Sequence, residues 1–97
     1  MTKKSVLEQL YKNLGFIRAR FMVKHLSLFG SVARDQAGAE SDVNILVSFE
    51  NKAGFDVLRD LKIYLEVLLS ATVNLVTEKA MCPQIRSSIE KELINVA

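Results

Sequence analysis

The chain has 97 residues and a formal net charge of +2, with 49% apolar and 25% charged residues. These values exclude a disordered chain and predict one small globular domain over residues 1–97. The charge is too small to support binding to nucleic acid by itself. No apolar run approaches the ~20 residues of a membrane-spanning helix. With one cysteine, Cys82, an internal disulfide is excluded, and a cytoplasmic location is expected.

The N-terminal segment is predicted to begin with a helix. Ser5 and Glu8 have the spacing of a capping box, in which two side chains bond free backbone amides at a helix start. Gly15 is typical of a helix end. Residues 16–23 fit either a loop or a lead-in strand. The apolar positions that recur at helical spacing before Gly15 are Leu7, Leu10, Tyr11 and Leu14.

A strand, a tight turn and a second strand are predicted next. Residues 25–29 form the first strand, and the turn begins at Gly30. Residues 31–35 are expected to start a short helix, and 36–41 to form a loop. Residues 43–49 show the two-residue period of side chains in a strand.

The second half of the chain is predicted to contain a helix, a strand and a last helix. Residues 55–69 place apolar side chains on one helical face, and residues 72–76 are rich in β-branched residues. Pro83 suits the first turn of the last helix. The order of elements predicts an α/β (α+β) fold with a small mixed sheet flanked by helices. The last helix carries an apolar stripe, expected to pack on the sheet, of Ile85, Ile89 and Leu93.

Gly30 and Ser31 open the turn after the first predicted strand. Glycine lets the backbone approach a ligand closely, and Ser31 offers a hydroxyl and an amide at a helix start, a combination that can hold a phosphate. Arg34 could add a charge-assisted contact. The alternative is an ordinary strand-to-helix turn capped by Ser31, and the turn taken alone favours this alternative.

Asp42 and Asn44 lie two residues apart, so in a strand their side chains point to the same face. Asn74 lies at a similar point of a neighbouring predicted strand. Three oxygen donors at the end of a sheet can hold a hard cation such as Mg²⁺. Taken singly, each has an ordinary alternative: an Asx turn for Asp42 and a polar strand residue for each Asn.

Together, the segments FGSVAR, SDVNILV and VNLVT resemble, in order and spacing, the motifs of the minimal nucleotidyltransferase (MNT) family, a branch of the DNA polymerase β-like nucleotidyltransferases. The resemblance covers nearly the whole chain. It implies a nucleotide-binding group, and a catalytic group that also holds Mg²⁺. The first group consists of Gly30, Ser31, Arg34 and Ser41, and the second of Asp42, Asn44 and Asn74.

The same resemblance implies cofactors and a partner. Many members of the family are antitoxins that pair with a HEPN-domain ribonuclease toxin. The implied activity is transfer of AMP from ATP, with Mg²⁺, to a tyrosine hydroxyl of that toxin. Neither a membrane nor a nucleic acid is an expected partner. A non-catalytic interaction adaptor remains an alternative interpretation.

The chain departs from the family pattern at three positions. Asn44 and Asn74 stand where acids are expected, and Asp35 stands where glycine is usual. Each Asn removes a negative charge from the metal site, and Asn74 cannot accept the proton of an attacking hydroxyl. Loss of one such group costs about 10²–10⁴ in rate, so transfer is predicted to be weak or absent. Natural divergence and deliberate substitution both fit this pattern, and a transferase that tolerates Asn ligands is the alternative.

Overall fold

The computed structural model describes residues 2–35, 42–50 and 54–97. A four-stranded sheet in the order β3-β2-β1-β4 forms its centre, with β2 parallel to β3 and the other pairs antiparallel. The predicted α+β fold with a mixed sheet is therefore confirmed. The elements in chain order are α1 (Lys3–Lys12), α2 (Leu14–Phe21), β1 (Val23–Phe29), β2 (Val43–Phe49), α3 (Phe55–Leu69), β3 (Val73–Thr77), η1 (Glu78–Ala80), α4 (Pro83–Ile89), η2 (Glu90–Glu92) and β4 (Ile94–Asn95).

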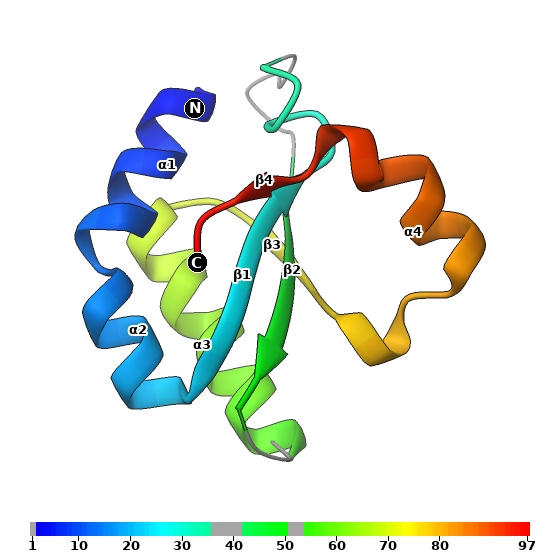
Figure 1. Ribbon diagram of the computed structural model, residues 1–97. Helices are drawn as coiled ribbons and strands as arrows, with labels where there is room; N and C mark the ends of the chain where they lie inside the picture. Colours follow the sequence, from blue (N-terminus) through cyan, green and yellow to red (C-terminus); the bar gives the residue numbers. More distant parts are fainter. Residues whose placement is uncertain (1, 36–41, 51–53) are drawn as a thin grey trace.

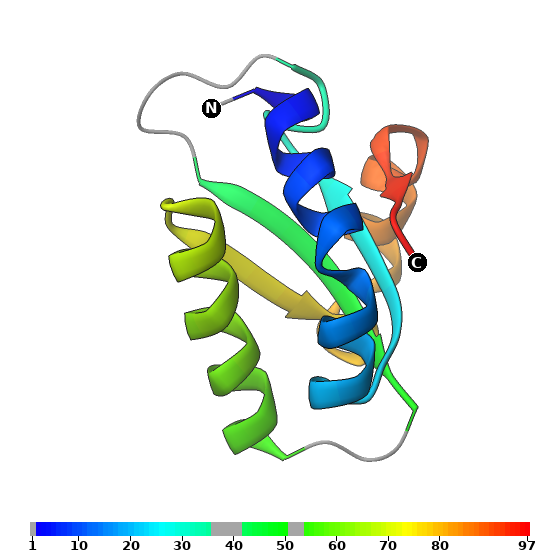
Figure 2. The same ribbon diagram turned by 90° about the vertical axis from the view of Figure 1, so that its left-hand side faces the viewer.

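The two faces of the sheet are covered differently. Figures 1 and 2 show α1, α2 and α3 on one face and α4 on the other. The core lies on the side of the three helices, because alternate strand positions are fully buried there: Leu26 and Leu28 of β1, and Val43, Ile45 and Val47 of β2. The intervening strand positions therefore face α4. No helix among the described residues is long and apolar enough to cross a membrane.

The first helix starts three residues earlier than predicted, with its N-cap at Thr2 and not at Ser5. The Thr2 hydroxyl accepts the Ser5 N–H at 3.1 Å, and the Ser5 hydroxyl accepts the Thr2 N–H at 3.2 Å. Thr2 is thus the N-cap, and Ser5 occupies the third helical position that the prediction assigned to Glu8. The prediction was wrong because two overlapping segments carry the same spacing of capping side chains.

A second helix follows where an end was predicted. Gly15 lies inside α2 and is exposed, and residues 16–23, predicted as loop or strand, are mostly helical. Ile17 and Phe21, one helical turn apart, are both buried in the core. Their burial outweighs the modest cost of a glycine in a helix, about 0.5–1 kcal/mol relative to alanine.

The strands and the long helix of the middle of the chain agree with prediction. β2 and α3 have the predicted bounds, and β1 and β3 differ from them by one or two residues. Residues 31–35 form a hydrogen-bonded turn and no helix. The Arg34 N–H bonds to the Gly30 carbonyl at 3.1 Å, and the Asp35 N–H bonds to the Val32 carbonyl at 3.0 Å. The loop predicted for 36–41 lies outside the described residues.

The C-terminal segment differs most from prediction. α4 contains no buried residue, and its Ile85 side chain is 52% exposed, so the predicted packing of the apolar stripe on the sheet is wrong at this position. Leu93 lies beyond the helix, which ends at Ile89. The short strand β4 then pairs with β1 through Leu28 and Ile94. This pairing holds η2 near the end of β1.

Candidate functional site

The predicted catalytic residues meet at one end of the sheet, where β1 ends and β2 and β3 begin. β1 and β2 are antiparallel, and Phe29 at the end of β1 pairs with Asn44 near the start of β2. β2 and β3 are parallel, and Asn44 pairs with Asn74. Asp42 directly precedes β2. The topology therefore brings the end of one strand and the beginnings of two others to the same place.

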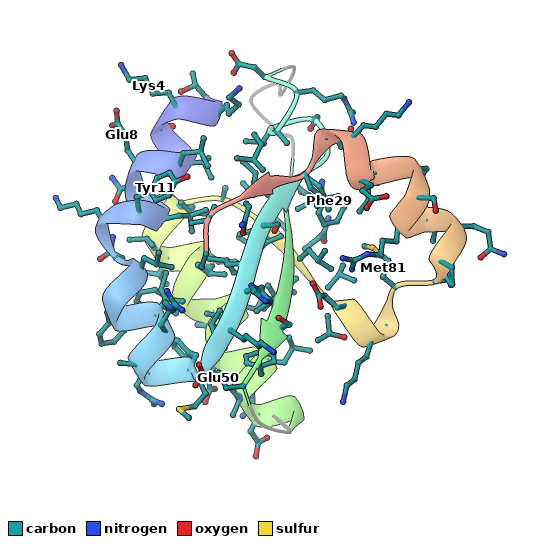
Figure 3. The ribbon with its side chains drawn as sticks, viewed as in Figure 1. Lys4, Glu8, Tyr11, Phe29, Glu50 and Met81 are labelled. Atoms are coloured by element: carbon teal, nitrogen blue, oxygen red, sulfur yellow. The ribbon has the colours of Figure 1, made fainter. Side chains whose placement is uncertain are left out.

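At this end of the sheet, the side chains of Phe29, Asn44 and Asn74 lie on the face that α4 covers. Figure 3 shows Phe29 on that side of the sheet, with Met81 also there. Residues paired directly across neighbouring strands point to the same face, so Asn44 and Asn74 lie on the α4 side as well. Asn44 is half-buried, whereas Asp42 and Asn74 are exposed. The site is consequently open to solvent and to ligands.

A single amide group joins the three predicted metal ligands. The Asn74 Nδ2 donates to Asp42 Oδ2 at 3.2 Å and to Asn44 Oδ1 at 3.1 Å. Both acceptors favour this orientation of the Asn74 side-chain amide, because the flipped amide would place the Asn74 oxygen against the Asp42 carboxylate. The convergence of the three side chains, predicted from the sequence, is thus present. An uncharged hydrogen-bond donor, however, lies between the oxygens that a cation would contact.

The donor set does not fit the metal centre of nucleotidyl transfer. That chemistry uses metal ions to bind and neutralise the reacting phosphates, and Mg²⁺ favours carboxylate ligands. Here Asp42 supplies one carboxylate, and Asn44 and Asn74 supply neutral amides. Over the ranges that the structure describes, no group of three or more His, Cys, Asp or Glu side chains could hold a metal. The three side chains are held together by hydrogen bonds instead.

Gly30 lies against this cluster and has a left-handed backbone, with φ at 83°. A Cβ atom placed on Gly30 would overlap the Asn44 side-chain nitrogen. Glycine is therefore required twice, for its backbone conformation and for the space that Asn44 fills. Close approach of a phosphate to Gly30 stays a prediction, and in this structure the group that lies close to Gly30 is the Asn44 side chain. Ser31 follows in the turn and is half-buried.

Glu92, which no sequence pattern indicated, binds two residues of the turn that begins at Gly30. Glu92, at the end of η2, accepts the Gly30 N–H on Oε1 at 3.3 Å and the Arg34 Nη1 on Oε2 at 2.5 Å. Two predicted nucleotide-binding residues, Gly30 and Arg34, are thus bridged by one carboxylate. Glu92 belongs to no motif and is about sixty residues away along the chain, so only the pairing of β4 with β1 reveals it. Ser41 lies outside the described residues.

Asp35, the third departure from the family pattern, also has a left-handed backbone, with φ at 59°. Aspartate is among the few residues that tolerate this conformation, which explains how it can stand where glycine is usual. Its Oδ1 accepts the Lys3 N–H at 3.3 Å. The substitution thereby joins the turn to the start of α1.

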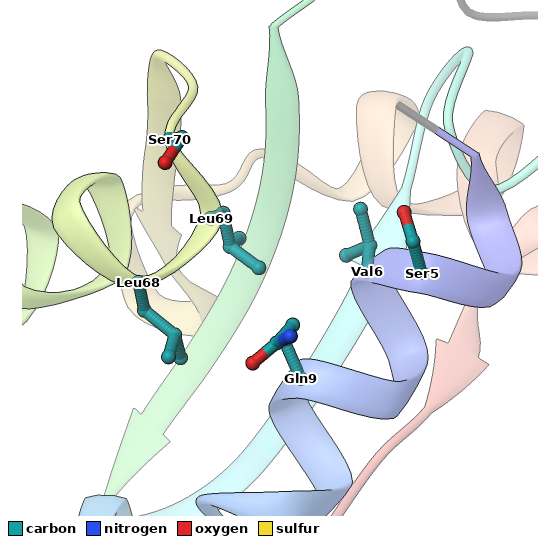
Figure 4. Close-up of a pocket in the computed structure, with 6 residues that line it drawn as sticks. All are labelled: Ser5, Val6, Gln9, Leu68, Leu69 and Ser70. Carbon is teal, nitrogen blue, oxygen red and sulfur yellow. The ribbon is translucent and has the colours of Figure 1, made fainter.

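A pocket of about 260 Å³ lies elsewhere, between the start of α1 and the end of α3 (Figure 4). These helices cover one face of the sheet, and the cluster of Asp42, Asn44 and Asn74 lies on the opposite face. None of the predicted site residues lines it. Its lining consists of Ser5, Val6, Gln9, Leu68, Leu69 and Ser70.

Comparison with known proteins identifies the family of the chain. Residues 8–96 match the model of the nucleotidyltransferase domain family. A Methanocaldococcus jannaschii protein that carries the provisional name protein adenylyltransferase is 37% identical over 98% of both chains. The protein adenylyltransferase MntA of Thermococcus cleftensis is 36% identical over 82% of this chain and 81% of its own.

The solved structures show the same relationship. One that is provisionally described as a minimal nucleotidyltransferase is 32% identical, with a TM-score of 0.82, and covers 97% of this chain and 95% of its own. The chain therefore belongs to the nucleotidyltransferase domain family. Its place within that family is the minimal nucleotidyltransferase branch.

A more distant structure shares the fold. It contains a tri-AMPylated HEPN toxin of Shewanella oneidensis in complex with an MNT antitoxin. The match has 14% identity and a TM-score of 0.68, over 94% of this chain and 71% of that chain. At this identity the likeness concerns the fold alone.

Proposed function

We propose that this chain is an MNT antitoxin that binds and neutralises a HEPN ribonuclease toxin, and that its transfer of AMP from ATP to a toxin tyrosine is impaired. Two relatives that bear the name protein adenylyltransferase support the class of activity. The complex of an MNT antitoxin with a HEPN toxin supports the class of partner. The impairment rests on the hydrogen bonds from the Asn74 amide to Asp42 and Asn44.

The chemistry of the cluster explains the impairment. An active site of this class would use Mg²⁺ to neutralise the triphosphate and to activate the attacking hydroxyl. In this chain the Asn74 nitrogen faces the Asp42 carboxylate, and Asp42 is the one charged member of the three. Asn74 also cannot take the proton of an incoming tyrosine hydroxyl, because an amide is not a base at neutral pH. Both the charge balance and the proton acceptor are therefore lost.

The proposed nucleotide contacts lie in the neighbouring turn. Gly30 offers its N–H, Ser31 its hydroxyl and Arg34 its guanidinium, and all three suit phosphate oxygens. The Gly30 N–H and the Arg34 guanidinium already bind a carboxylate in this structure. Their affinity for an anion supports the proposed role. Nucleotide binding can thus persist in a chain that transfers AMP poorly.

Neutralisation by binding has a distinct stoichiometry. A transferase inactivates many toxin molecules in turn, whereas a binding antitoxin inactivates one for each copy present.

The exposed Cys82, the one cysteine of the chain, fits a reducing compartment such as the cytoplasm. We therefore place the complex there and treat residues 1–97 as one domain.

The test uses a HEPN-domain ribonuclease, sought first in the reading frame next to this one, together with its ribonuclease activity and ATP labelled on the α-phosphate. The proposal predicts that inhibition reaches completion near equimolar chain, with or without ATP, and that no labelled AMP appears on the toxin. Labelled toxin and inhibition by a small fraction of an equivalent would support the second candidate, an active transferase, which the names of the relatives favour. A chain that neither binds nor inhibits the toxin would contradict both.

A further inference from the structure

We propose that the Glu92 carboxylate occupies the phosphate position of the turn formed by Gly30 and Arg34, so that a nucleotide must displace it in order to bind. Glu92 then lowers the affinity of the site for the triphosphate. This inference rests on the proposed nucleotide binding at that turn. It adds a residue that neither the motifs nor the comparisons assign.

The contacts of Glu92 are those of an anionic ligand. One carboxylate oxygen accepts a backbone N–H, that of Gly30 at 3.3 Å, and the other accepts the Arg34 guanidinium at 2.5 Å. Carboxylate and phosphate are alternative partners for arginine and for backbone amides, since both present paired negative oxygens. A phosphate that used these two donors would occupy the place that Glu92 holds.

The fold positions Glu92 firmly. η2 directly precedes β4, and β4 pairs with β1 through Leu28 and Ile94. The next residues are fixed as well, because the Val96 N–H bonds to the Leu26 carbonyl at 2.8 Å and the Val96 side chain is buried. Since β1 leads directly into the Gly30 turn, this pairing brings η2 beside that turn. Glu92 is consequently tethered, and a nucleotide competes with it at a high local concentration of carboxylate.

The contact is weak enough to be displaced. The Arg34 and Glu92 side chains are 46% and 20% exposed, so solvent screens their attraction. Ion pairs with this degree of exposure contribute little, and the competition is expected to lower triphosphate affinity by only about two- to tenfold. The opposite interpretation is that Glu92 merely orients Arg34 for phosphate. The two interpretations differ in sign, because removal of an orienting residue would weaken binding.

The experiment measures binding of inorganic tripolyphosphate and of ATP by calorimetry, at constant ionic strength and with EDTA to exclude metal. Three variants are compared with the unchanged chain. Glu92→Gln removes the charge, and Glu92→Asp keeps the charge but shortens its reach. Glu90→Gln removes a charge from an exposed position of the same turn, η2. It measures the general effect of one fewer negative charge.

We expect both Glu92 variants to bind tripolyphosphate about two- to tenfold more tightly, and Glu90→Gln to bind it nearly as the unchanged chain does. Tighter binding by Glu92→Asp would show that reach, and not charge alone, causes the competition. Thermal melts without ligand verify folding, and Glu92→Asp decides the question if Glu92→Gln does not fold. Equal or weaker binding by the folded Glu92 variants would overturn the inference.

Failure of the underlying proposal has a different signature. If neither anion binds to the unchanged chain or to any variant, nucleotide binding at the turn is wrong, and this inference falls with it. If the unchanged chain binds ATP but the Glu92 variants bind it no more tightly, the competition alone is wrong. The two failures are thus separated by the behaviour of the unchanged chain and its Glu90 control.

Discussion

The side-chain nitrogen of Asn74 lies 3.2 Å from the carboxylate of Asp42, and it donates a hydrogen bond to that group from the neighbouring strand. An acid at position 74 would place two carboxylates near each other, and their repulsion would be relieved by a bound cation or by a shared proton. The amide makes the same end of the sheet stable without either. An internal hydrogen bond therefore stands where an acid at position 74 would have produced charge repulsion.

The first prediction concerns Asn74→Asp. The variant loses the donor to Asp42 and Asn44 and gains a repulsive charge, so it should lose about 1 kcal/mol of unfolding free energy, or roughly 4–8 °C in Tm. Millimolar Mg²⁺ should restore much of this loss while leaving the unchanged chain unaffected. Thermal melts with and without Mg²⁺ measure both effects. Asn95→Asp, at an exposed position of β4, is the matched control, and an equal response to Mg²⁺ in that control would refute the explanation.

A second prediction concerns Gly30. Gly30→Ala forces a side chain into a left-handed position and against Asn44, so it should cost at least about 1–2 kcal/mol. In an Asn44→Ala background the overlap disappears and part of the loss should return. Gly15→Ala, at an open helical position, should instead stabilise by about 0.5–1 kcal/mol. Denaturant unfolding measures all of them, and similar values for the alanines at positions 15 and 30 would contradict the assigned geometry.

Asp35 provides a third prediction. Asp35→Ala removes the bond to the Lys3 N–H and keeps a left-handed backbone that alanine adopts poorly. Asp35→Gly removes the same bond but adopts that backbone freely. The alanine variant should therefore unfold more easily than the glycine variant by about 1 kcal/mol. Chemical denaturation of the pair tests this order, and a glycine variant that is the less stable of the two would show that backbone conformation does not govern the position.

The fourth prediction addresses ATP binding. Asn44→Asp combined with Asn74→Asp supplies two carboxylates beside Asp42, so the affinity for ATP in the presence of Mg²⁺ should rise. In EDTA the added negative charge should give no such gain. Calorimetry in both buffers distinguishes a metal-dependent increase from a general one. Equal affinity of the two proteins for magnesium-ATP would refute the interpretation of positions 44 and 74 as metal ligands.

The sequence was sufficient for the parts of the fold that rest on periodic burial. The alternation in residues 43–49 and the apolar face of 55–69 gave their bounds correctly, because long periodic segments bury one face whatever surrounds them. The meeting of Asp42, Asn44 and Asn74 was also predictable, since a crossover through a helix makes the two strands parallel neighbours.

Other features depend on contacts that local patterns do not contain. Gly15 was predicted to end a helix, yet α2 continues because Ile17 faces the core. The strand β4 has two residues, too few for a periodic signal. Glu92 reaches the Gly30 turn only through that strand, so its role could not be predicted from spacing.

AMP transfer itself is the most direct test of the central claim that Asn44 and Asn74 impair this site. The measurement is the rate at which labelled AMP from magnesium-ATP appears on the HEPN partner, for the unchanged chain and for the variant with Asp at both positions. The account predicts transfer at least about 10²-fold faster by the variant. Transfer by the unchanged chain at the rate of the variant, with the label on a toxin tyrosine, would contradict it.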